Sequence, residues 1–261
     1  MIRALHTSAT GMAAQETNVN TISNNIANAN TNAFKKSRAE FNDLLYETIQ
    51  EAGDRSSNDS EYSVGLQIGS GAKTSAVRKN FEQGSVQVTN NPYDLMIQGE
   101  GFFGIISADD QVHYTRDGSF GVDSQGNLVT KSGQKVFPGI NIPPNTTHLN
   151  ITANGKVEAY TKGTVEPTQL GEIPIFTFTN PTGLKSLGGN LYGATAGSGF
   201  PTQMEAGREI AGTIEQGMLE SSNVSVMNEM TDLIKAQRAY EMNSKVMGVA
   251  DQMMQTVNGL K

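Results

Sequence analysis

The sequence predicts an elongated α+β fold in which paired, coiled-coil-like N- and C-terminal α-helices flank an inserted antiparallel β domain. Two observations lead to this prediction. Apolar residues recur every seven positions at both ends of the chain, and they alternate over short runs in between. A seven-residue recurrence returns the same face of a helix every two turns, whereas alternation is typical of half-buried strands.

The C-terminal segment, residues 223–261, carries the clearest seven-residue pattern. Its central line consists of Val226, Leu233, Tyr240, Met247 and Met254. Two flanking lines widen it: Met230, Ala236, Ala250 and Val257 on one side, and Ala239, Val246, Met253 and Leu260 on the other. A contact between two helices buries one strip of each helix, and this stripe is broader than one strip.

The N-terminal segment shows the same spacing with an unusual polar face. Its apolar line is Leu5, Met12, Val19 and Ile26, with Ile22 beside it. From Met1 to Phe34 the formal charges are Arg3 and Glu16, and the remaining polar residues are mainly Asn, Thr and Ser. Neutral hydrogen-bonding side chains can be buried against polypeptide, whereas unpaired charges cannot be buried without a large cost.

These two patterns predict that the terminal helices pack against other copies of the chain. An intramolecular stalk of two helices, roughly 45 Å long for thirty residues, is the alternative. The predicted assembly interface comprises Leu5, Met12, Val19, Ile22, Ile26, Val226, Met230, Leu233, Tyr240, Val246, Met247, Met253, Met254 and Val257.

Composition narrows the possible partners. The formal net charge of −7 argues against nucleic acid and anionic membranes as partners. The chain has no Cys, so disulfides, thiolate metal sites and thiol nucleophiles are excluded. The apolar runs are too short for a transmembrane helix, so no direct membrane insertion is expected. The first residues lack the continuous apolar segment of a cleavable secretory signal.

The segments after the first helix are polar and irregular. Residues 28–33 are rich in Asn, which predicts the end of the helix there. Residues 39–49 are expected to form a short helix or an extended arm. The polar stretch from Glu51 to Ser63 is expected to be a loop, or an arm that becomes ordered on contact.

Short alternating runs separated by turn residues begin at Val64. The runs include residues 66–68, 85–89, 94–97, 102–106, 113–115, 119–122, 127–130, 135–137, 150–152, 156–160 and 172–178. Turn signals every eight to twelve residues predict an antiparallel β domain, similar to a sandwich or a barrel. The expected division is a helical layer of residues 1–32 and 223–261, a connecting region of 33–76 and 205–222, and a β domain of 77–204.

Motifs for catalysis or ligand binding are weak. Residues 99–104 match G-x-G-x-x-G, but an apolar strand follows in place of the helix that dinucleotide binding requires. Residues 123–127 resemble the start of a calcium loop without its bidentate acid. His6, His113 and His148 lie in separate segments without metal-ligand spacing. We therefore expect no catalytic residues, metal or cofactor. A secreted enzyme with a helical oligomerisation stalk remains the alternative class.

Both ends of the chain resemble the bacterial flagellar rod and hook proteins. At the N-terminus the resemblance lies in residues 24–35, with Asn24, Asn25, Asn28, Thr31 and Phe34. At the C-terminus it lies in residues 237–245. The matching residues there are Gln237, Arg238, Tyr240, Glu241 and Asn243. Central motifs at residues 99–103, 114–120, 126–130 and 189–192 follow in the family's order, so the resemblance covers essentially the whole chain.

Within this family the length and the polar insertion before residues 65–71 are most similar to the distal rod members. A proximal rod or hook protein is the alternative. The resemblance implies a homopolymer that joins other rod and hook proteins inside the surrounding basal-body rings. It also implies a location in the flagellar basal body, from periplasm to outer membrane, and type III export.

Ala33 departs from the family pattern, which commonly has Gly at this position. If the backbone there is left-handed, Ala costs roughly 1 kcal/mol. Asn32 could take the turn in its place.

Overall fold

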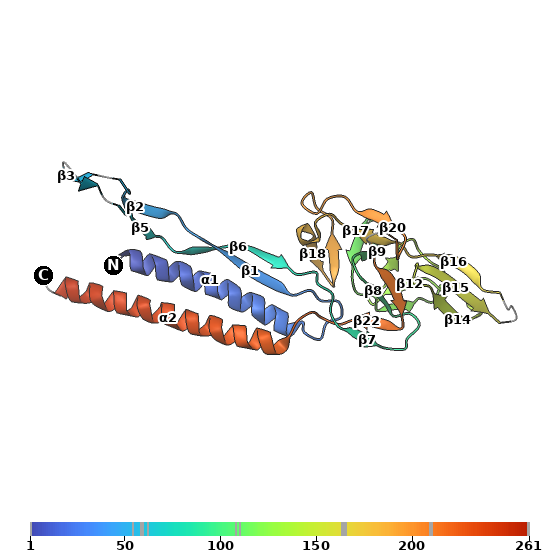
Figure 1. Cartoon of the computed structure of the whole chain (residues 1–261). Helices are drawn as coiled ribbons and strands as arrows, with labels where there is room; N and C mark the ends of the chain where they lie inside the picture. Colours follow the sequence, from blue (N-terminus) through green and yellow to red (C-terminus); the bar gives the residue numbers. More distant parts are fainter. Residues whose placement is uncertain are drawn as a thin grey trace. The chain divides into compact units, whose positions relative to one another are not determined.

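The computed structural model describes residues 2–53, 55–57, 60–61, 63–107, 109, 111–162, 166–208 and 211–259. It has an α+β fold, in which the chain begins and ends with a helix and the segment between these helices in sequence forms mainly antiparallel strands (Figure 1). Its contacts define two compact units. Unit 1 consists of residues 1–27, 37–79 and 225–261, and unit 2 consists of 28–36 and 80–224.

Unit 1 is built around two long helices. Helix α1 spans Ile2–Ala27 and helix α2 spans Val226–Gly259. They lie side by side and antiparallel, so both chain ends are at the same end of the pair (Figure 1). Helix α1 ends at the Asn-rich segment, as the sequence predicts, since Asn is a weak helix former.

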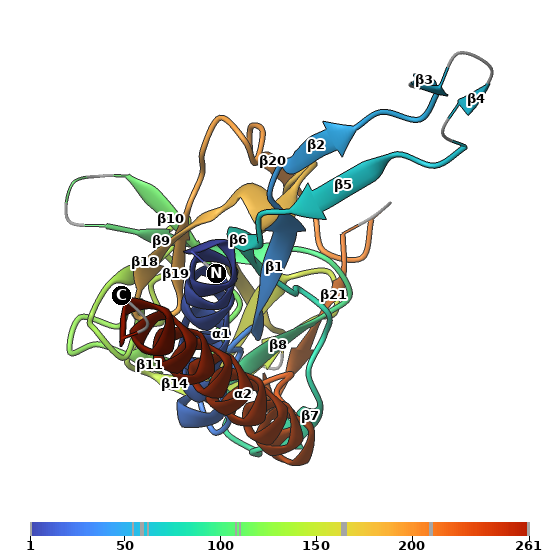
Figure 2. The same ribbon diagram turned by 90° about the vertical axis from the view of Figure 1, so that its left-hand side faces the viewer.

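A long β ribbon packs along α1 and then leaves the helices. Strands β1 (Ser37–Asp43) and β6 (Ala72–Lys79) pair next to α1. Strands β2 (Tyr46–Gln50) and β5 (Leu66–Gly69) continue the ribbon away from the helices (Figure 2), followed by β3 (Arg55–Ser57) and β4 (Ser60–Glu61). Of the two forms expected for residues 39–49, the structure therefore shows the extended one.

The largest sheet of unit 2 joins strands from most of its length. In the described residues the order is β11-β12-β13-β9-β10-β19-β18, and β17 pairs with both β9 and β20. The bounds are β9 Phe102–Ile106, β10 Val112–Thr115, β11 Phe120–Val122, β12 Leu128–Thr130, β13 Lys135–Val136, β17 Ile175–Thr177, β18 Lys185–Gly188, β19 Leu191–Gly193 and β20 Thr202–Met204.

Smaller antiparallel groups complete unit 2. Strands β14 (Thr146–Ile151), β15 (Lys156–Thr161) and β16 (Thr168–Glu172) form one sheet. The returning chain pairs twice with earlier strands: β21 (Thr213–Gln216) with β8 (Leu95–Gln98), and β22 (Met218–Glu220) with β7 (Val86–Val88). A short 3₁₀ helix, η1, covers Pro181–Gly183.

The hydrophobic core of unit 2 has an aliphatic and an aromatic part. The aliphatic part includes Ile97, Ile105, Val157 and Ile175, each almost fully buried. The aromatic part consists of Phe102, Tyr114, Phe176, Phe178 and Tyr192, with Leu184. Its rings meet edge to face, an arrangement that aromatic quadrupoles favour.

The antiparallel strands expected between residues 94 and 137 are confirmed, because alternation and turn residues agree there. Strands β6 and β16 were among those that the sequence analysis did not predict. Their sequences are largely polar, and they are strands because a partner supplies backbone hydrogen bonds. The segments expected as a connecting region, 33–76 and 205–222, are divided: 37–76 belongs to unit 1, whereas 33–36 and 205–222 belong to unit 2.

Candidate assembly surface

Helix α1 covers one line of α2 residues that is spaced by seven. Glu229 Oε2 accepts a hydrogen bond of 3.0 Å from Asn25 Nδ2, and Asn243 lies against Gly11. Ala236 and Ala250, on the same line, are buried. A methyl group built on Gly11 would come within 2.9 Å of Asn243 Nδ2, so small residues allow the two helices to approach closely.

The central line of the sequence prediction lies next to this covered line. Leu233, Met247 and Met254 are half-buried, whereas Tyr240 and Val226 are exposed. Leu233, Tyr240, Met247 and Met254 stand four positions after members of the covered line, on the adjacent side of the helix. The pairing with α1 therefore involves two adjacent lines of α2.

A second apolar line of α2 is left uncovered. It runs through Ala239, Met242, Val246, Val249 and Met253, at spacings that alternate between three and four residues. The last four side chains are 61%, 50%, 53% and 48% exposed. Alternating three- and four-residue spacing is the pattern of a coiled-coil seam. We call these five residues the free seam.

The other predicted interface residues of α2 are also exposed. Met230 lies away from both the covered line and the free seam, on the same side of the helix as Met227 and Ile234, which are exposed and were not predicted. Val257 is exposed as well, near the C-terminal end of α2. Leu260 lies outside the described residues.

The predicted interface residues of α1 are largely covered within unit 1. Ile22 is buried, and Leu5, Met12, Val19 and Ile26 are half-buried. At the other end of α1, Arg3 forms an ion pair with Glu47 of the β2 ribbon. Some hydroxyl groups of α1 form hydrogen bonds within the helix, since those of Thr17 and Thr21 donate to backbone carbonyls one turn earlier.

Asn25 links three elements of unit 1. Its Nδ2 donates to the carbonyl of Ser37 at 2.8 Å and to Glu229 Oε2 at 3.0 Å, and its Oδ1 accepts from the Ser37 backbone N–H at 2.9 Å. This side chain is buried, so its polar atoms need partners. It fixes the end of α1 to both β1 and α2.

The next motif residues shape the turn after α1. The Thr31 backbone N–H donates to the Asn28 carbonyl, and the Thr31 hydroxyl donates to Asn28 Oδ1 at 3.2 Å. Ala33 has φ = 55°, in the left-handed region, and Asn32 does not. The expectation that Asn32 takes the turn is therefore wrong. Ala33 is held there because its backbone N–H donates to the Glu220 carbonyl at 2.8 Å.

A buried charge cluster lies directly after this turn. Lys35 Nζ donates to Glu220 Oε1 at 2.5 Å and to the Glu82 carbonyl at 2.7 Å. Arg116 Nε lies 4.0 Å from Glu220 Oε2, and its Nη2 donates to the Gly99 carbonyl. All three charged side chains are buried. Burial lowers the pKa of Lys35, and the negative charge of Glu220 opposes this shift.

Asn223 completes the junction of three chain segments in unit 2. Its Oδ1 accepts from the Lys36 backbone N–H at 2.7 Å, and its Nδ2 donates to the carbonyls of Asn80 and Glu82 at 3.0 Å. The outgoing and returning segments are thus held side by side. Phe34 and Lys35, next to this junction, are buried.

The C-terminal motif is divided between two faces of α2. Asn243 lies on the covered line, whereas Gln237, Arg238 and Glu241 are exposed. Arg238 Nη1 donates to Glu241 Oε2 at 3.0 Å. An exposed pair of this kind contributes about 0.5 kcal/mol or less to stability, so these residues contribute little to the stability of unit 1 alone.

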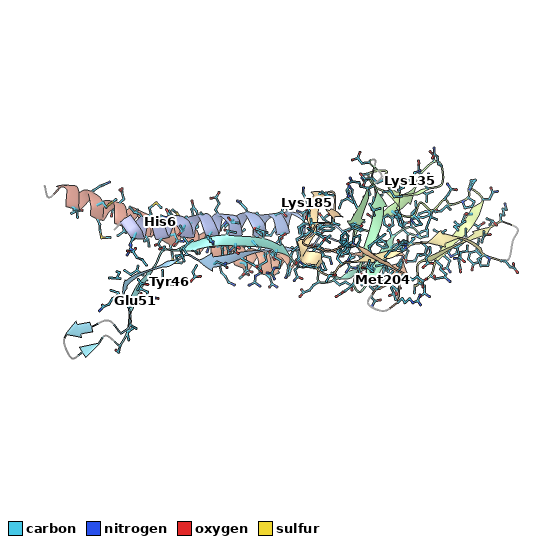
Figure 3. The ribbon with its side chains drawn as sticks, turned by 90° about the horizontal axis from the view of Figure 1, so that it is seen from above. His6, Tyr46, Glu51, Lys135, Lys185 and Met204 are labelled. Carbon is cyan, nitrogen blue, oxygen red and sulfur yellow. The ribbon has the colours of Figure 1, made fainter. Side chains whose placement is uncertain are left out.

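The β2–β5 ribbon presents apolar side chains to solvent. Tyr46, Ile49, Leu66 and Ile68 are all exposed, and Leu45 precedes them. Figure 3 shows Tyr46 and Glu51 on the ribbon where it leaves the helices. Gly71, with φ = 113°, lets the base of the ribbon approach Thr10 of α1. The free seam, this ribbon and the group of Met227, Met230 and Ile234 are exposed apolar surfaces of unit 1.

Unit 2 also contains a polar pocket of about 370 Å³. Its walls include Asn32, Thr115, Asp117, Lys131 and Asn190. In the described residues no three His, Cys, Asp or Glu side chains gather as a metal ion would require. Neither α1 nor α2 is apolar enough over its length to cross a membrane.

Three family models match successive parts of the chain. "Flagella basal body rod protein" matches residues 5–35, "Flagellar hook protein FlgE/F/G D1 domain" matches 96–159, and "Flagellar basal body rod FlgEFG protein C-terminal" matches 215–260. The first and last contain the Asn25 linkage and the free seam.

Relatives match over the full length. The flagellar basal-body rod protein FlgG of Caulobacter vibrioides is 46% identical over 100% of both chains. The chain belongs to the FlgG family of flagellar basal-body rod proteins. FlgG of Buchnera aphidicola (Schizaphis graminum) is 44% identical over 100% of both chains, and FlgG of Bacillus subtilis is 35% identical over the same share. The protein is thus a structural subunit of the flagellar distal rod.

Members of the FlgG family are structural proteins of the basal body, which is where this chain is located. A solved structure, the Helicobacter pylori flagellar hook protein FlgE2, matches 71% of this chain and 43% of its own length. That match has 15% identity and a TM-score of 0.25, too low to support an argument about the fold.

Sequence reasoning overlooked some functional candidates. Met242 and Val249 of the free seam were absent from the predicted interface, although their three- and four-residue spacing was visible. The charge cluster of Lys35, Arg116 and Glu220 could not be predicted from the sequence, because its three residues come together from distant segments.

Proposed function

We propose that this chain polymerises through its terminal helices into the tubular distal rod and that the free seam of α2 contacts a helix of a neighbouring copy. The observation that carries the proposal is the exposure of Met242, Val246, Val249 and Met253 at coiled-coil spacing. Exposed apolar strips of this kind mark interaction surfaces. Parallel seams of this type would transmit motor torque to the hook over many contacts at once.

A charged residue in the free seam tests the proposal. Val249→Asp should prevent assembly, because the carboxylate would be buried against apolar side chains. Ser244→Asp is the matched control, since it adds the same charge to an exposed position of the same helix, away from the seam. Sedimentation and electron microscopy of the purified chains at high concentration should show straight tubes for the control and none for Val249→Asp. Equal assembly of both variants would contradict the proposal.

The terminal helices are proposed to become fully ordered only on assembly. Ordering costs about 1–2 kcal/mol per residue in backbone entropy, and α2 has little covered apolar surface in a single chain. The lack of order before assembly would also keep the chain narrow enough for type III export. Amide exchange should show weak protection of residues 233–254 in the dissociated chain and strong protection in tubes. Strong protection in the dissociated chain would reject this part.

The ribbon insertion from Glu51 to Gly71 is proposed to bridge neighbouring subunits and stiffen the rod. Its exposed Ile49, Leu66 and Ile68 provide apolar surface for such a contact. A surface loop without partners is the alternative. Deletion of the insertion should make assembled tubes bend more easily in electron micrographs, whereas unchanged bending would favour the alternative.

Other rod and hook proteins and the basal-body rings are the proposed neighbours of the assembled rod. The relatives carry the name basal-body rod protein, and a rod must end on other axial proteins. We therefore propose that the assembled rod extends from the periplasm to the outer membrane. Fractionation of flagellated cells should recover the chain with intact basal bodies and not with free hooks.

A further inference from the structure

Three side chains at the junction in unit 2 form a group that the proposed assembly does not use. Lys35 lies shortly after α1, whereas Glu220 and Asn223 lie shortly before α2. Lys35 and Glu220 are buried, and Asn223 is half-buried. An amine, a carboxylate and a carboxamide are together the groups needed to form an amide bond between two side chains.

The Lys35 amine lies beside the Asn223 carboxamide, because both groups donate to one oxygen atom. Lys35 Nζ donates to the Glu82 carbonyl at 2.7 Å, and Asn223 Nδ2 donates to the same carbonyl at 3.0 Å. Two donors on one carbonyl oxygen are neighbours in space. The fold therefore holds the amine next to the carboxamide, and such proximity is a large part of what a reaction between two groups requires.

Glu220 is placed to accept a proton from this amine. Its Oε1 accepts a hydrogen bond from Lys35 Nζ at 2.5 Å and another from the Gly84 backbone N–H at 2.8 Å. Burial lowers the pKa of Lys35, the negative charge of Glu220 opposes this shift, and the positive charge of Arg116 adds to it. A buried amine with a lowered pKa is more readily available in its neutral, nucleophilic form.

The Asn223 carboxamide is held at both of its polar atoms. Its Oδ1 accepts from the Lys36 backbone N–H at 2.7 Å, and its Nδ2 also donates to the Asn80 carbonyl at 3.0 Å. Attack of a nucleophile on Cγ would place negative charge on Oδ1. A backbone N–H at this distance stabilises such a charge, as in an oxyanion hole.

We propose that Lys35 and Asn223 form an intramolecular isopeptide bond, with Glu220 as the catalytic residue. Glu220 takes one proton from the Lys35 ammonium, and the neutral Nζ attacks Cγ of Asn223. A C–N bond forms between Nζ and Cγ, and the bond between Cγ and Nδ2 breaks. Glu220 gives its proton to Nδ2 and accepts the second proton from Nζ. Ammonia leaves, and its protonation to ammonium returns Glu220 to the carboxylate.

This bond would join the two ends of unit 2 covalently. The three residues meet only in the folded chain, so the bond would form after folding. It would close a ring of residues 35–223, and a cross-link across a long loop stabilises a fold by restricting the unfolded chain. The chain has no Cys that could form a disulfide instead. The inference concerns a single chain and does not depend on polymerisation.

Mass spectrometry of the purified full-length chain tests the proposal, because loss of ammonia lowers the mass by about 17 Da. After folding and incubation at neutral pH, most of the parent chain should show this loss. Chain kept in denaturant should retain the mass of its sequence. A folded parent chain that also retains the full mass would overturn the proposal.

Tryptic digestion locates the bond. Trypsin cleaves after Lys and Arg, and a linked Lys35 would be protected from cleavage. The digest should therefore contain a branched peptide that joins residues 4–36 to residues 209–235. Succinimide formation at the Asn154-Gly155 or Asn258-Gly259 pair also releases ammonia, so a loss of mass without the branched peptide would overturn the proposal.

Substitutions separate the roles of the groups. Lys35→Met and Glu220→Gln should keep the full mass, because the first removes the nucleophile and the second removes the carboxylate. The matched controls are Lys36→Met, which removes the neighbouring amine and keeps the backbone N–H, and Glu82→Gln at an exposed position. Both controls should lose ammonia like the parent chain.

Asn223→Ala tests the same bond at a half-buried position, and it should keep the full mass even if the substitutions at the two buried positions prevent folding. Circular dichroism establishes that each variant is folded. Loss of ammonia from folded Lys35→Met or Asn223→Ala, with the same digest as the parent chain, would overturn the proposal. The same loss from folded Glu220→Gln would overturn the catalytic role of Glu220. Failure of the chain to form tubes would not alter any of these results.

Discussion

Unit 1 and unit 2 bury their apolar residues in opposite ways. Unit 2 encloses an aliphatic core and an aromatic core, with side chains such as Phe103, Ile105 and Ile175 fully covered. In the described part of unit 1, Ile22 is the one large apolar side chain that is buried, and the other buried apolar residues are alanines. Much of the apolar surface of α2 and of the ribbon remains in solvent.

This difference concerns how much of its apolar surface each unit covers by itself. Burial contributes about 25 cal/mol per Å² of apolar surface, so unit 2 gains its stability from its own residues. Unit 1 leaves much of its apolar surface exposed, as the proposed contact with other copies would require. Such a division suits a subunit whose β unit folds before assembly and whose helices gain most of their burial during assembly.

The largest expected effect comes from breaking the charge cluster of unit 2. Glu220→Leu removes the buried carboxylate that Lys35 and Arg116 share, which should lower the free energy of unfolding by about 3–5 kcal/mol. Denaturant titration of the full chain measures this. Glu205→Leu removes an exposed pair with Arg208 and should cost about 1 kcal/mol or less. A similar cost for both variants would mean that the cluster does not stabilise unit 2.

Alkaline pH should weaken the same unit. Burial, with the charge of Glu220, raises the pKa of Tyr192 to about 12 from its ordinary value of 10.0. Between these two pH values the folded chain keeps the phenol proton of Tyr192 while the unfolded chain loses it. The contribution of Tyr192 to the free energy of unfolding is therefore fully present below pH 10 and is lost between pH 10 and about 12. The total loss is about 3 kcal/mol.

Replacement of this tyrosine isolates its contribution to the pH dependence. Tyr192→Phe should remove that part of the decline in thermal unfolding between pH 10 and 12. Tyr46→Phe on the exposed ribbon serves as the control. An unchanged slope in Tyr192→Phe would contradict the assignment.

A smaller effect is expected in unit 1 from the buried side chain of Asn25. Asn25→Ala leaves the Ser37 backbone groups and Glu229 without their partner, which should cost about 1–3 kcal/mol. Amide exchange of α1 near its C-terminal end measures the loss. Asn20→Ala, at an exposed position of the same helix, should change stability by about 0.5 kcal/mol or less. Equal protection in both variants would show that α1 ends independently of Asn25.

The smallest effect is a gain in stability at the turn. Ala33→Gly relieves the left-handed backbone strain and should stabilise unit 2 by up to about 1 kcal/mol. Ala29→Gly in the same segment, where φ is not positive, should destabilise by a similar amount. Thermal unfolding distinguishes the two signs, and a loss of stability in Ala33→Gly would contradict the strain.

Several features were predictable because they depend on local pattern. The seven-residue recurrence predicted both terminal helices, and the alternating runs between residues 94 and 137 predicted the strands of unit 2. The motifs at both ends indicated the flagellar rod and hook proteins, and full-length relatives confirm this. Each of these signals lies within a short window of the chain.

Other features required distant segments to meet. The pairing of polar strands β1 and β6 follows from backbone hydrogen bonds that any sequence can make. Lys35, Arg116 and Glu220 are far apart in sequence, so their burial as one cluster was invisible before folding. The choice between Asn32 and Ala33 depended on the Glu220 carbonyl.

The sequence by itself determined that this chain has helices at both ends, an antiparallel β region between them and the motifs of a flagellar rod protein, because periodicity and motifs are local properties. Tertiary structure decided which apolar lines of α2 are covered by α1 and which remain free. The physical reason is that a periodic pattern shows which residues share a face of a helix, whereas only the packed neighbour shows which face is already occupied.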